Sequence, residues 1–415
     1  MNLKRLPAGA GLWAILALSL VLRIAGAMWC QSRLPADQRF EFGDSEAYWV
    51  LAQHMARGEP FEYGSPDVRV FRMPGYPALL AALFWLSSPD MPVLAGRLLS
   101  AVLGTLAVAA VCWLTTTLFD RRTGLVAAFA AACYPGAIAM SVFVLSEAPF
   151  CPVYLAQLAA WTKSWQAGRH AFSWAVVSGL FGGLAALMRP DWLLFIPFAA
   201  LAGLFLARPR TRHLQLSLTM MLVVAAVMAP WWWRNLRVVG HFVPTTLQVG
   251  ASLYDGLNPQ ATGASEMSFV ATFVKKEQQD PCLPGEPFEY RLDRRLWNAA
   301  GEWASNHPAR VVKLAAVKFV RMWNLWPNDP QNHGFLTRLI TTATFLPAII
   351  TALAGIWVTR RQLWPTALCW LPAVYLTLLH LIFVSSIRYR EPPMLGLLVF
   401  TAAFFTRGSR PSAAH

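Results

Sequence analysis

The 415-residue sequence contains few charged residues: Asp, Glu, Lys and Arg make up only 13% of it, whereas about 25% is usual for a soluble chain. Hydrophobic residues make up 56%, and the mean hydropathy is +0.43. Several apolar windows of about 18 to 25 residues are long enough to cross a bilayer as helices. The composition excludes an ordinary soluble protein. It predicts an all-α polytopic membrane protein with about ten transmembrane helices, in a range of about eight to thirteen.

Common catalytic motifs are also missing. The sequence has no Walker loop, no GxGxxG after a strand, no HExxH and no GxSxG, so nucleotide-binding, metallopeptidase and serine-hydrolase classes lack support. The six cysteines form no CxxC or Cys/His spacing, which argues against a disulfide framework or a zinc knuckle. No internal repeat of the transporter type is evident.

Positive charge is concentrated in short loops that we assign to the cytoplasmic side, although the whole chain carries +14. This asymmetry follows the positive-inside rule and predicts that both termini are cytoplasmic. It explains the high net charge without nucleic-acid binding. The basic residues on this side are Lys4, Arg5, Arg121, Arg122, Lys163, Arg169, Arg208, Arg210, Arg212, Arg360, Arg361, Arg407 and Arg410.

The stretch Phe40–Pro77 follows the first span, which we place at Gly11–Trp29. Cleavage of that span at Ala25-Gly26-Ala27 stays open. An acidic turn at 43–46 is expected to begin an amphipathic helix over Ser45–Arg57, and Tyr76–Ser87 is expected to be a short re-entrant helix. Charges placed beside a membrane are costly unless they function or stay hydrated.

The later loops define the remaining spans. We expect them at Val93–Phe119, Leu125–Val144, Ala148–Thr162, Ala171–Met188, Trp192–Ala207, Leu214–Trp233, Leu336–Val358, Leu363–Val384 and Met394–Phe405. Between the central and late spans lies a small extracytoplasmic region with predicted helices over Tyr290–Asn306 and Pro308–Trp326, the second lying on the membrane. Three units follow: a transmembrane catalytic module (1–233) that includes the first external loop (31–75), the extracytoplasmic region (234–333), and C-terminal transmembrane helices (334–415).

With this topology, acidic and arginine residues from distant loops meet at the external membrane boundary, at span ends rather than span centres. Guanidinium groups pair with phosphate oxygens, and a carboxylate can accept a proton from an attacking hydroxyl, so the set suits group transfer from a phosphate-bearing substrate. Structural salt bridges remain the alternative for any single residue. The set comprises Asp44, Glu46, Arg69, Arg72, Glu147, Arg189, Asp191, Arg234, Arg388, Arg390 and Glu391.

Several of these stretches resemble dolichyl-phosphate-mannose–protein mannosyltransferase-like enzymes, which belong to the GT-C superfamily of polytopic glycosyltransferases. The similarity covers about Gly11–Pro259, and is looser at Lys318–Trp326 and Arg388–Pro392. It rests on the order and external placement of short motifs rather than on any one of them. These motifs are Asp44–Tyr48, Arg72–Pro77, Ala95–Ser100, Leu145–Glu147, Pro230–Trp231 and Arg234–Arg237.

The resemblance implies transfer of a hexosyl or pentosyl group, with inversion, from a polyprenyl-phosphate donor to an acceptor hydroxyl on the extracytoplasmic face. It assigns Asp44 as the base and Glu147 as its catalytic partner, with the lipid in a groove between spans. Ser45 separates Asp44 from Glu46, whereas many relatives place two acids side by side, so the role of Glu46 stays open. The implied ligands of the donor phosphate are Arg69, Arg72, Arg388, Tyr389 and Arg390; candidate substrate contacts are Glu46, Tyr48, Arg97 and Arg234.

Other features of the function stay open at this stage. No cofactor is implied except a divalent metal ion, as in some relatives, for which His54, Glu62, His241 and His307 could supply ligands. The acceptor could be a protein, a glycolipid or a wall polysaccharide. We expect a bacterial inner membrane location with the site facing the periplasm or exterior. A polyprenyl-linked polysaccharide ligase or polymerase is the main alternative function, and a transporter is the next.

Overall fold

The structure is a computed structural model that describes residues 9–35, 37–88, 91–328 and 334–407. Lys4, Arg5 and Arg410, which entered the topology prediction, lie outside these ranges. The described residues form helices and no β-strand, as predicted. Five helical segments are long and apolar enough to cross a membrane: Ala10–Arg33 (α1), Val93–Leu118 (α4), Gly168–Met188 (which includes α8, Ala171–Met188), Arg210–Val239 (α10) and Phe335–Thr359 (α15). The expected total of about ten spans stays a prediction.

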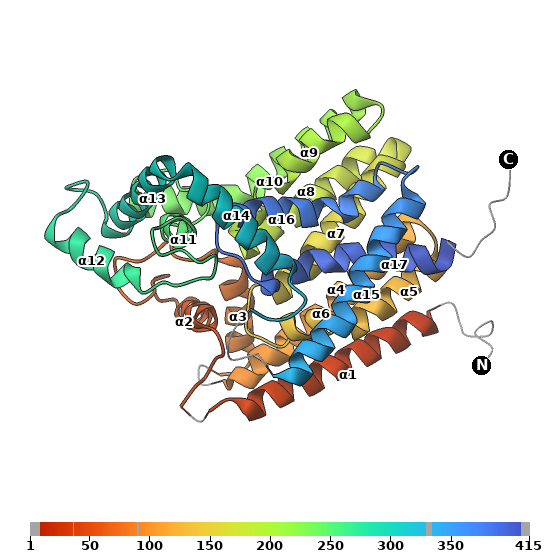
Figure 1. Cartoon of the computed structure of the whole chain (residues 1–415), viewed down its shortest axis with the longest axis horizontal. Coiled ribbons are helices and arrows are strands. Elements are labelled where there is room, and N and C mark those ends of the chain that lie inside the picture. The colour runs from red at the N-terminus through yellow and green to blue at the C-terminus, as the bar shows by residue number, and fades with distance from the viewer. Residues whose placement is uncertain (1–8, 36, 89–90, 329–333, 408–415) are drawn as a thin grey trace.

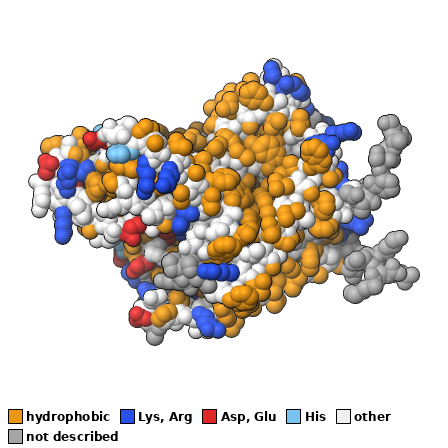
Figure 2. Space-filling view, viewed as in Figure 1, with side chains coloured by type: hydrophobic (Ala, Val, Ile, Leu, Met, Phe, Trp, Pro, Cys, Tyr) orange, Lys and Arg blue, Asp and Glu red, His pale blue; other side chains and the backbone are white. Residues whose placement is uncertain are grey.

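The long helices pack side by side in a bundle (Figure 1). Helix α4 packs against α1 and α7 (Glu147–Gln166), α7 against α8, and α8 against α10, while α15 packs against α17 (Glu391–Arg407). Shorter apolar helices are α3 (Gly75–Leu86), α9 (Phe195–Leu206) and α16 (Leu371–Ile382). Apolar side chains cover much of the bundle on the face drawn in Figure 2, whereas acidic side chains gather at the end formed by α2 and α11–α14 and Lys and Arg side chains lie at both ends.

The expected span Leu125–Val144 is broken, which corrects the sequence prediction. Helix α5 (Arg121–Cys133) stops before Pro135, which has no N–H to donate and favours an extended residue before it. Tyr134 is that extended residue, and a short helix α6 (Pro135–Met140) follows. The expected span Leu363–Val384 is likewise divided into a 3-10 turn (Thr366–Cys369, η5) and α16.

Arg23 donates hydrogen bonds to backbone carbonyls that this break leaves without partners in the helix. Its guanidinium group donates to the carbonyls of Ala131 and Ala132 at the end of α5, at 3.4 and 3.2 Å. Such partners are needed wherever a helix is interrupted within a bilayer. Arg23 lies inside α1 and is 1% exposed, so the expectation that ionisable residues occupy only span ends is wrong for this residue.

The region that we predict to be extracytoplasmic forms helices α11 (Val249–Gly256), α12 (Phe269–Gln279), α13 (Phe288–Asn306) and α14 (Pro308–Trp323). The helices expected at Tyr290–Asn306 and Pro308–Trp326 are therefore present, with shifts of two or three residues at one end. Buried Lys318 of α14 donates to the carbonyls of Gly256 at 2.9 Å and Ile382 at 2.5 Å. The first bond ties α14 to the end of α11, and the second attaches the region to the end of α16.

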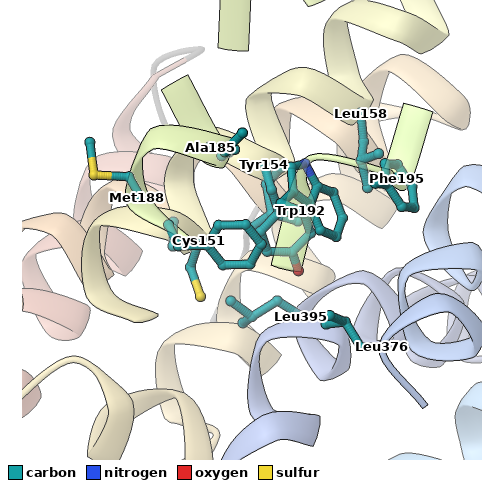
Figure 3. Packing of buried hydrophobic residues seen from close by; sticks show 14 of the residues in the cluster. Cys151, Tyr154, Leu158, Ala185, Met188, Trp192, Phe195, Leu376 and Leu395 are labelled. Atoms are coloured by element: carbon teal, nitrogen blue, oxygen red, sulfur yellow. The ribbon is translucent and has the colours of Figure 1, made fainter. Parts of the chain in front are cut away.

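Aromatic side chains from α7, from the turn after α8 and from the start of α9 pack together in the buried core (Figure 3). The rings of Trp192 and Phe195 stack with centroids 4.0 Å apart, and Tyr154 of α7 packs against Trp192 at 5.2 Å. The Trp192 indole donates to Gln157 at 2.6 Å, which satisfies its buried N–H. This core fixes the turn that carries Arg189 and Asp191.

Candidate active site

Asp44 lies in the first turn of α2 (Gly43–Arg57), where a carboxylate is favoured by the helix dipole. The helix begins where the sequence predicted it, within two residues. Oδ1 of Asp44 accepts a hydrogen bond from Arg72 Nη2 at 2.6 Å, and Oδ2 accepts one from Arg388 Nη1 at 3.2 Å. Its side chain is 34% exposed, so the carboxylate remains accessible to solvent.

Glu147 is the first residue of α7 and is fully buried. Arg388, in the 3-10 turn Ile387–Arg390 (η6), donates to both of its oxygens, at 2.6 and 3.2 Å. Arg189 Nη1 lies 2.8 Å from Oε1 of Glu147, and the same guanidinium pairs with Asp191 at 2.7 Å. Arg388 therefore joins the two acids that the sequence singled out.

These six side chains form what we call the acid–arginine cluster: Asp44, Arg72, Glu147, Arg189, Asp191 and Arg388. They come from α2, the loop before α3, α7, the turn after α8, and η6. Carboxylates and guanidinium groups are present in equal number, so the charges offset one another. Such a cluster can bind an anion by exchange, because a phosphate can replace a carboxylate on the same guanidinium donors.

Aromatic and amide groups surround Arg72. Its Nη1 donates to Gln248 Oε1 at 2.7 Å, and its guanidinium carbon lies 4.7 Å from the ring centroid of Phe71 and 5.5 Å from that of Tyr48. Tyr48 itself is buried, and its ring meets that of Tyr76 edge-on. These contacts fix the direction in which Arg72 presents its charge to Asp44.

Tyr389 lies beside Arg388 and stacks on His380, with ring centroids 4.0 Å apart. Burial raises the pKa of its phenol, although the Arg388 charge opposes the shift. His380 Nδ1 lies 2.7 Å from the carbonyl oxygen of Val384. A carbonyl can only accept, so Nδ1 of His380 carries the proton. The stack holds Tyr389 at the edge of the acid–arginine cluster.

The electrostatics of Asp44 follow from its two arginine partners. Burial alone would raise the pKa of this carboxyl, but Arg72 and Arg388 outweigh that effect and lower it to about 2. Burial would lower the pKa of Arg388, but the carboxylates of Glu147 and Asp44 raise it, and Glu147 has the larger effect. As arranged here, Asp44 is ionised at neutral pH and holds its charge too firmly to be a strong base.

Other residues named from the sequence lie apart from the cluster. Arg69 is half-exposed and pairs with Glu62 at 2.8 Å. Arg390 is fully buried, pairs with Glu391 at 3.2 Å and donates to the Asn324 carbonyl. Arg97 is also fully buried, which excludes direct contact with a substrate in this arrangement.

Two further candidates have different surroundings. Arg234 lies over the ring of Trp231 at 4.9 Å and donates to Asn235. Glu46 is exposed, and only Asp44 of this acidic turn enters the cluster.

The residues proposed as metal ligands do not gather. His54 lies 3.8 Å from Glu59, Glu62 pairs with Arg69, His241 pairs with Glu286 at 2.7 Å, and His307 Nδ1 contacts the Trp303 carbonyl at 2.8 Å. Within the described parts of the chain, no three His, Cys, Asp or Glu side chains come close enough to hold an ion. The donor set present therefore does not fit a metal ion, and no step below depends on one.

Sequence reasoning missed two residues of this site. Gln248 lies in the extracytoplasmic region, where no motif marks it, and only the fold brings it to Arg72. His380 was passed over because it lies in an apolar stretch. An ionisable side chain inside such a stretch is itself a signal of function or of a specific partner, and could have been used.

Comparison with known proteins gives one family match and several similar folds. Residues 73–233 match the family model described as dolichyl-phosphate-mannose-protein mannosyltransferase, whereas no curated protein sequence matches the chain. Among solved structures, oligosaccharyltransferase AglB from Archaeoglobus fulgidus, in complex with an inhibitory peptide and a dolichol-phosphate, is 16% identical with a TM-score of 0.56, over 95% of this chain and 50% of that one. The same organism's oligosaccharyltransferase with Zn and sulfate gives 16% and 0.58, over 95% and 48%.

ArnT from Cupriavidus metallidurans, bound to undecaprenyl phosphate, is 14% identical with a TM-score of 0.47, over 96% of this chain and 77% of that one. The chain spans about half the length of the oligosaccharyltransferase structures that it matches. Its fold is similar to that of these oligosaccharyltransferase structures. The resemblance to the mannosyltransferase-like family is confirmed, and the matched segment 73–233 contains Glu147 and Arg189 but not Asp44 or Arg388.

Proposed function

We propose that this protein is a membrane glycosyltransferase that moves a sugar from a polyprenyl-phosphate donor to an acceptor hydroxyl, with inversion. The observation that carries the proposal is the bridge from Asp44 through Arg388 to Glu147, at 3.2, 2.6 and 3.2 Å. It joins a partly exposed carboxylate to guanidinium groups suited to phosphate. The family match and the shared fold support the same class of reaction.

In the proposed reaction, the donor phosphate binds Arg72 and Arg388, with the Tyr389 hydroxyl as a further donor. The phosphate takes over hydrogen bonds that Asp44 holds in this structure, and the pKa of Asp44 rises because a negative group now shares its arginines. Asp44 is then free to accept the proton of the acceptor hydroxyl. The acceptor oxygen bonds to the anomeric carbon, the carbon–oxygen bond to phosphate breaks, and polyprenyl phosphate leaves with the electron pair.

Glu147 has a different role in this proposal. It is fully buried, so it acts by holding Arg388 and Arg189 in place rather than by touching the acceptor. The arginines stabilise the negative charge that develops on the departing phosphate. Arg69 and Arg390, implied by the resemblance, are left out of this set because they are engaged elsewhere.

We further propose the membrane arrangement that the positive-inside pattern predicts. The acid–arginine cluster faces the periplasm or exterior of a bacterial inner membrane, both termini are cytoplasmic, and the extracytoplasmic region 234–333 shapes the acceptor side. The contact of Gln248 with Arg72 supports this last point. A cysteine introduced at exposed Gly43 should react with a membrane-impermeant maleimide in intact cells.

The direct test uses purified protein in lipid nanodiscs with a panel of polyprenyl-phosphate sugars and a membrane extract as the acceptor source. Release of polyprenyl phosphate from one donor, lost in Asp44→Asn, is the expected result. Glu59→Gln, an exposed acid after the same helix, is the matched control and should turn over normally. Turnover unaffected by Asp44→Asn would contradict the mechanism and favour a ligase-type enzyme.

A further inference from the structure

Arg97 is fully buried near the start of α4, and its guanidinium contacts three separate segments of the chain. Nη2 donates to Glu41 Oε2 at 2.7 Å, in the loop that enters α2. Nη1 donates to the Val142 carbonyl at 3.3 Å, in the segment that enters α7. Nε donates to Gln31 Oε1 at 3.1 Å, at the end of α1.

Two of these segments carry the acids of the proposed mechanism. Glu41 precedes Asp44 by three residues, and Val142 precedes Glu147 by five. Neither segment is helical at the contact, so regular hydrogen bonding does not fix its position. A guanidinium group offers several donors in one rigid plane, and can therefore set the relative position of two such segments.

Gly96, next to Arg97, also packs against both of these segments. A Cβ atom on Gly96 would lie 2.8 Å from the ring of Trp49 in α2 and 3.4 Å from Val144, just before α7. The first distance is too short for any side chain. The absence of a side chain at Gly96 thus lets both acid-bearing segments rest on the same turn of α4. The same two segments also contact each other, because the rings of Phe42 and Phe143 meet edge-on with centroids 5.1 Å apart.

We propose that Arg97 is a positioning residue that sets the separation of Asp44 and Glu147 by clamping the segments that lead to them. The inference rests on the proposed function for its kinetic consequence, but its structural consequence is independent of it. Arg97 contacts no substrate, and its effect on transfer passes through the backbone of the two segments. It replaces the substrate-contact role that the resemblance suggested for this residue.

The structural test measures disulfide formation between cysteines at positions 42 and 143. The exposed native thiols Cys133 and Cys282 are replaced by serine, and a variant with Phe42→Cys alone reports any reaction with native Cys30. With Arg97 present, the pair should cross-link rapidly. Arg97→Gln should slow disulfide formation by about tenfold, because a displacement of the two segments by about 1 Å moves the thiols out of the reactive geometry.

The matched control is Arg295→Gln. Arg295 is also largely buried and is held by fully buried Glu277, but it lies in the extracytoplasmic region, far along the chain from both segments. It should leave cross-linking unchanged. Glu41→Gln should slow cross-linking as Arg97→Gln does. The double variant should slow it little further, because both changes remove the same contact between Arg97 and Glu41.

In the transfer assay, Arg97→Gln should lower kcat by about tenfold to a hundredfold with little change in the KM for donor, and Arg97→Lys should recover part of it. Unchanged cross-linking in Arg97→Gln overturns the proposed positioning role of Arg97, whatever the transfer activity of this variant. Equal loss of kcat in Arg97→Gln and Arg295→Gln overturns it as well, because that result means general destabilisation. Normal clamp behaviour without any donor turnover would instead contradict the proposed function.

Discussion

Arg388 holds Glu147 by two hydrogen bonds, from Nε to Oε1 at 2.6 Å and from Nη2 to Oε2 at 3.2 Å, although the residues are 241 positions apart. Glu147 is fully buried, and the Arg388 side chain is 15% exposed. A two-point contact between a planar guanidinium and a carboxylate fixes orientation as well as distance. The pair therefore attaches the last part of the chain to the start of α7 at the centre of the proposed site.

Removing Arg388 should destabilise the protein, because it leaves Glu147 buried with only Arg189 as a partner. Arg388→Met is expected to lower the free energy of unfolding by about 3 kcal/mol. The double variant Arg388→Met/Glu147→Leu should cost less than the sum of the single changes, with a coupling of at least about 1 kcal/mol. Denaturation in detergent micelles measures both values. Exposed Arg169→Met is the control, and strictly additive effects would show that the two-point contact contributes nothing.

Arg72 should control the acidity of Asp44 in the free enzyme. Arg72→Gln removes a positive charge 2.6 Å from the carboxylate, so the ionised form is stabilised less and the pKa of Asp44 rises from about 2. The acid limb of the pH profile of kcat/KM, which reports the free enzyme, should move to higher pH. Arg57→Gln at the exposed end of α2 should leave it in place. An unmoved limb in Arg72→Gln would mean that Asp44 is not the titrating group.

Glu289 of α13 should make stability depend on pH in the opposite direction from Asp44. Its carboxylate accepts from the backbone N–H groups of Arg69 and Val70, at 2.8 and 2.9 Å, but burial raises its pKa from 4.5 to about 7. Between these values the folded protein binds a proton that the unfolded chain has released. Stability from this group is therefore fully present below about pH 4.5 and is lost as the pH rises to about 7.

Thermal unfolding of the wild type and of Glu289→Gln between pH 5 and 8 tests this linkage. The wild-type Tm should fall relative to the variant as the pH rises. The expected slope disappears in Glu289→Gln because the amide does not titrate. Glu302→Gln, an exposed acid on the same helix, should behave like the wild type. Parallel curves for wild type and Glu289→Gln would show that the carboxyl keeps an ordinary pKa.

Much of the helical architecture follows from local pattern. The acidic turn before an amphipathic stretch located α2 to within two residues, and apolar length located α4, α8 and α15 almost to the residue. The break at Tyr134 was missed because an apolar window does not register the effect of a proline within it. The proline at 135 was visible, but only the structure shows Arg23 satisfying the carbonyls that the break leaves free.

The candidate site could be predicted only in part. Asp44, Glu147, Arg72 and Arg388 were named because the predicted topology places them at one membrane boundary and because they match motifs of the family that the chain resembles. Topology does not say which charges pair, so Arg390 was grouped with Arg388, although the structure turns its side chain inward to Glu391. The same limit applies to Arg97, whose partners Glu41 and Val142 come from loops with no sequence signal for contact.

The proposed reaction depends most on Asp44 accepting the proton of the acceptor hydroxyl after the donor is bound. We would load wild type and Asp44→Asn, in nanodiscs, with the radiolabelled lipid-linked sugar that turns over, and measure both bound donor and sugar transferred in a single turnover. We expect Asp44→Asn to bind donor equally or more tightly, because Arg72 and Arg388 no longer pair with a carboxylate at position 44. We expect its transfer rate to be lower by about a hundredfold or more. Transfer at the wild-type rate by Asp44→Asn would contradict the proposed reaction.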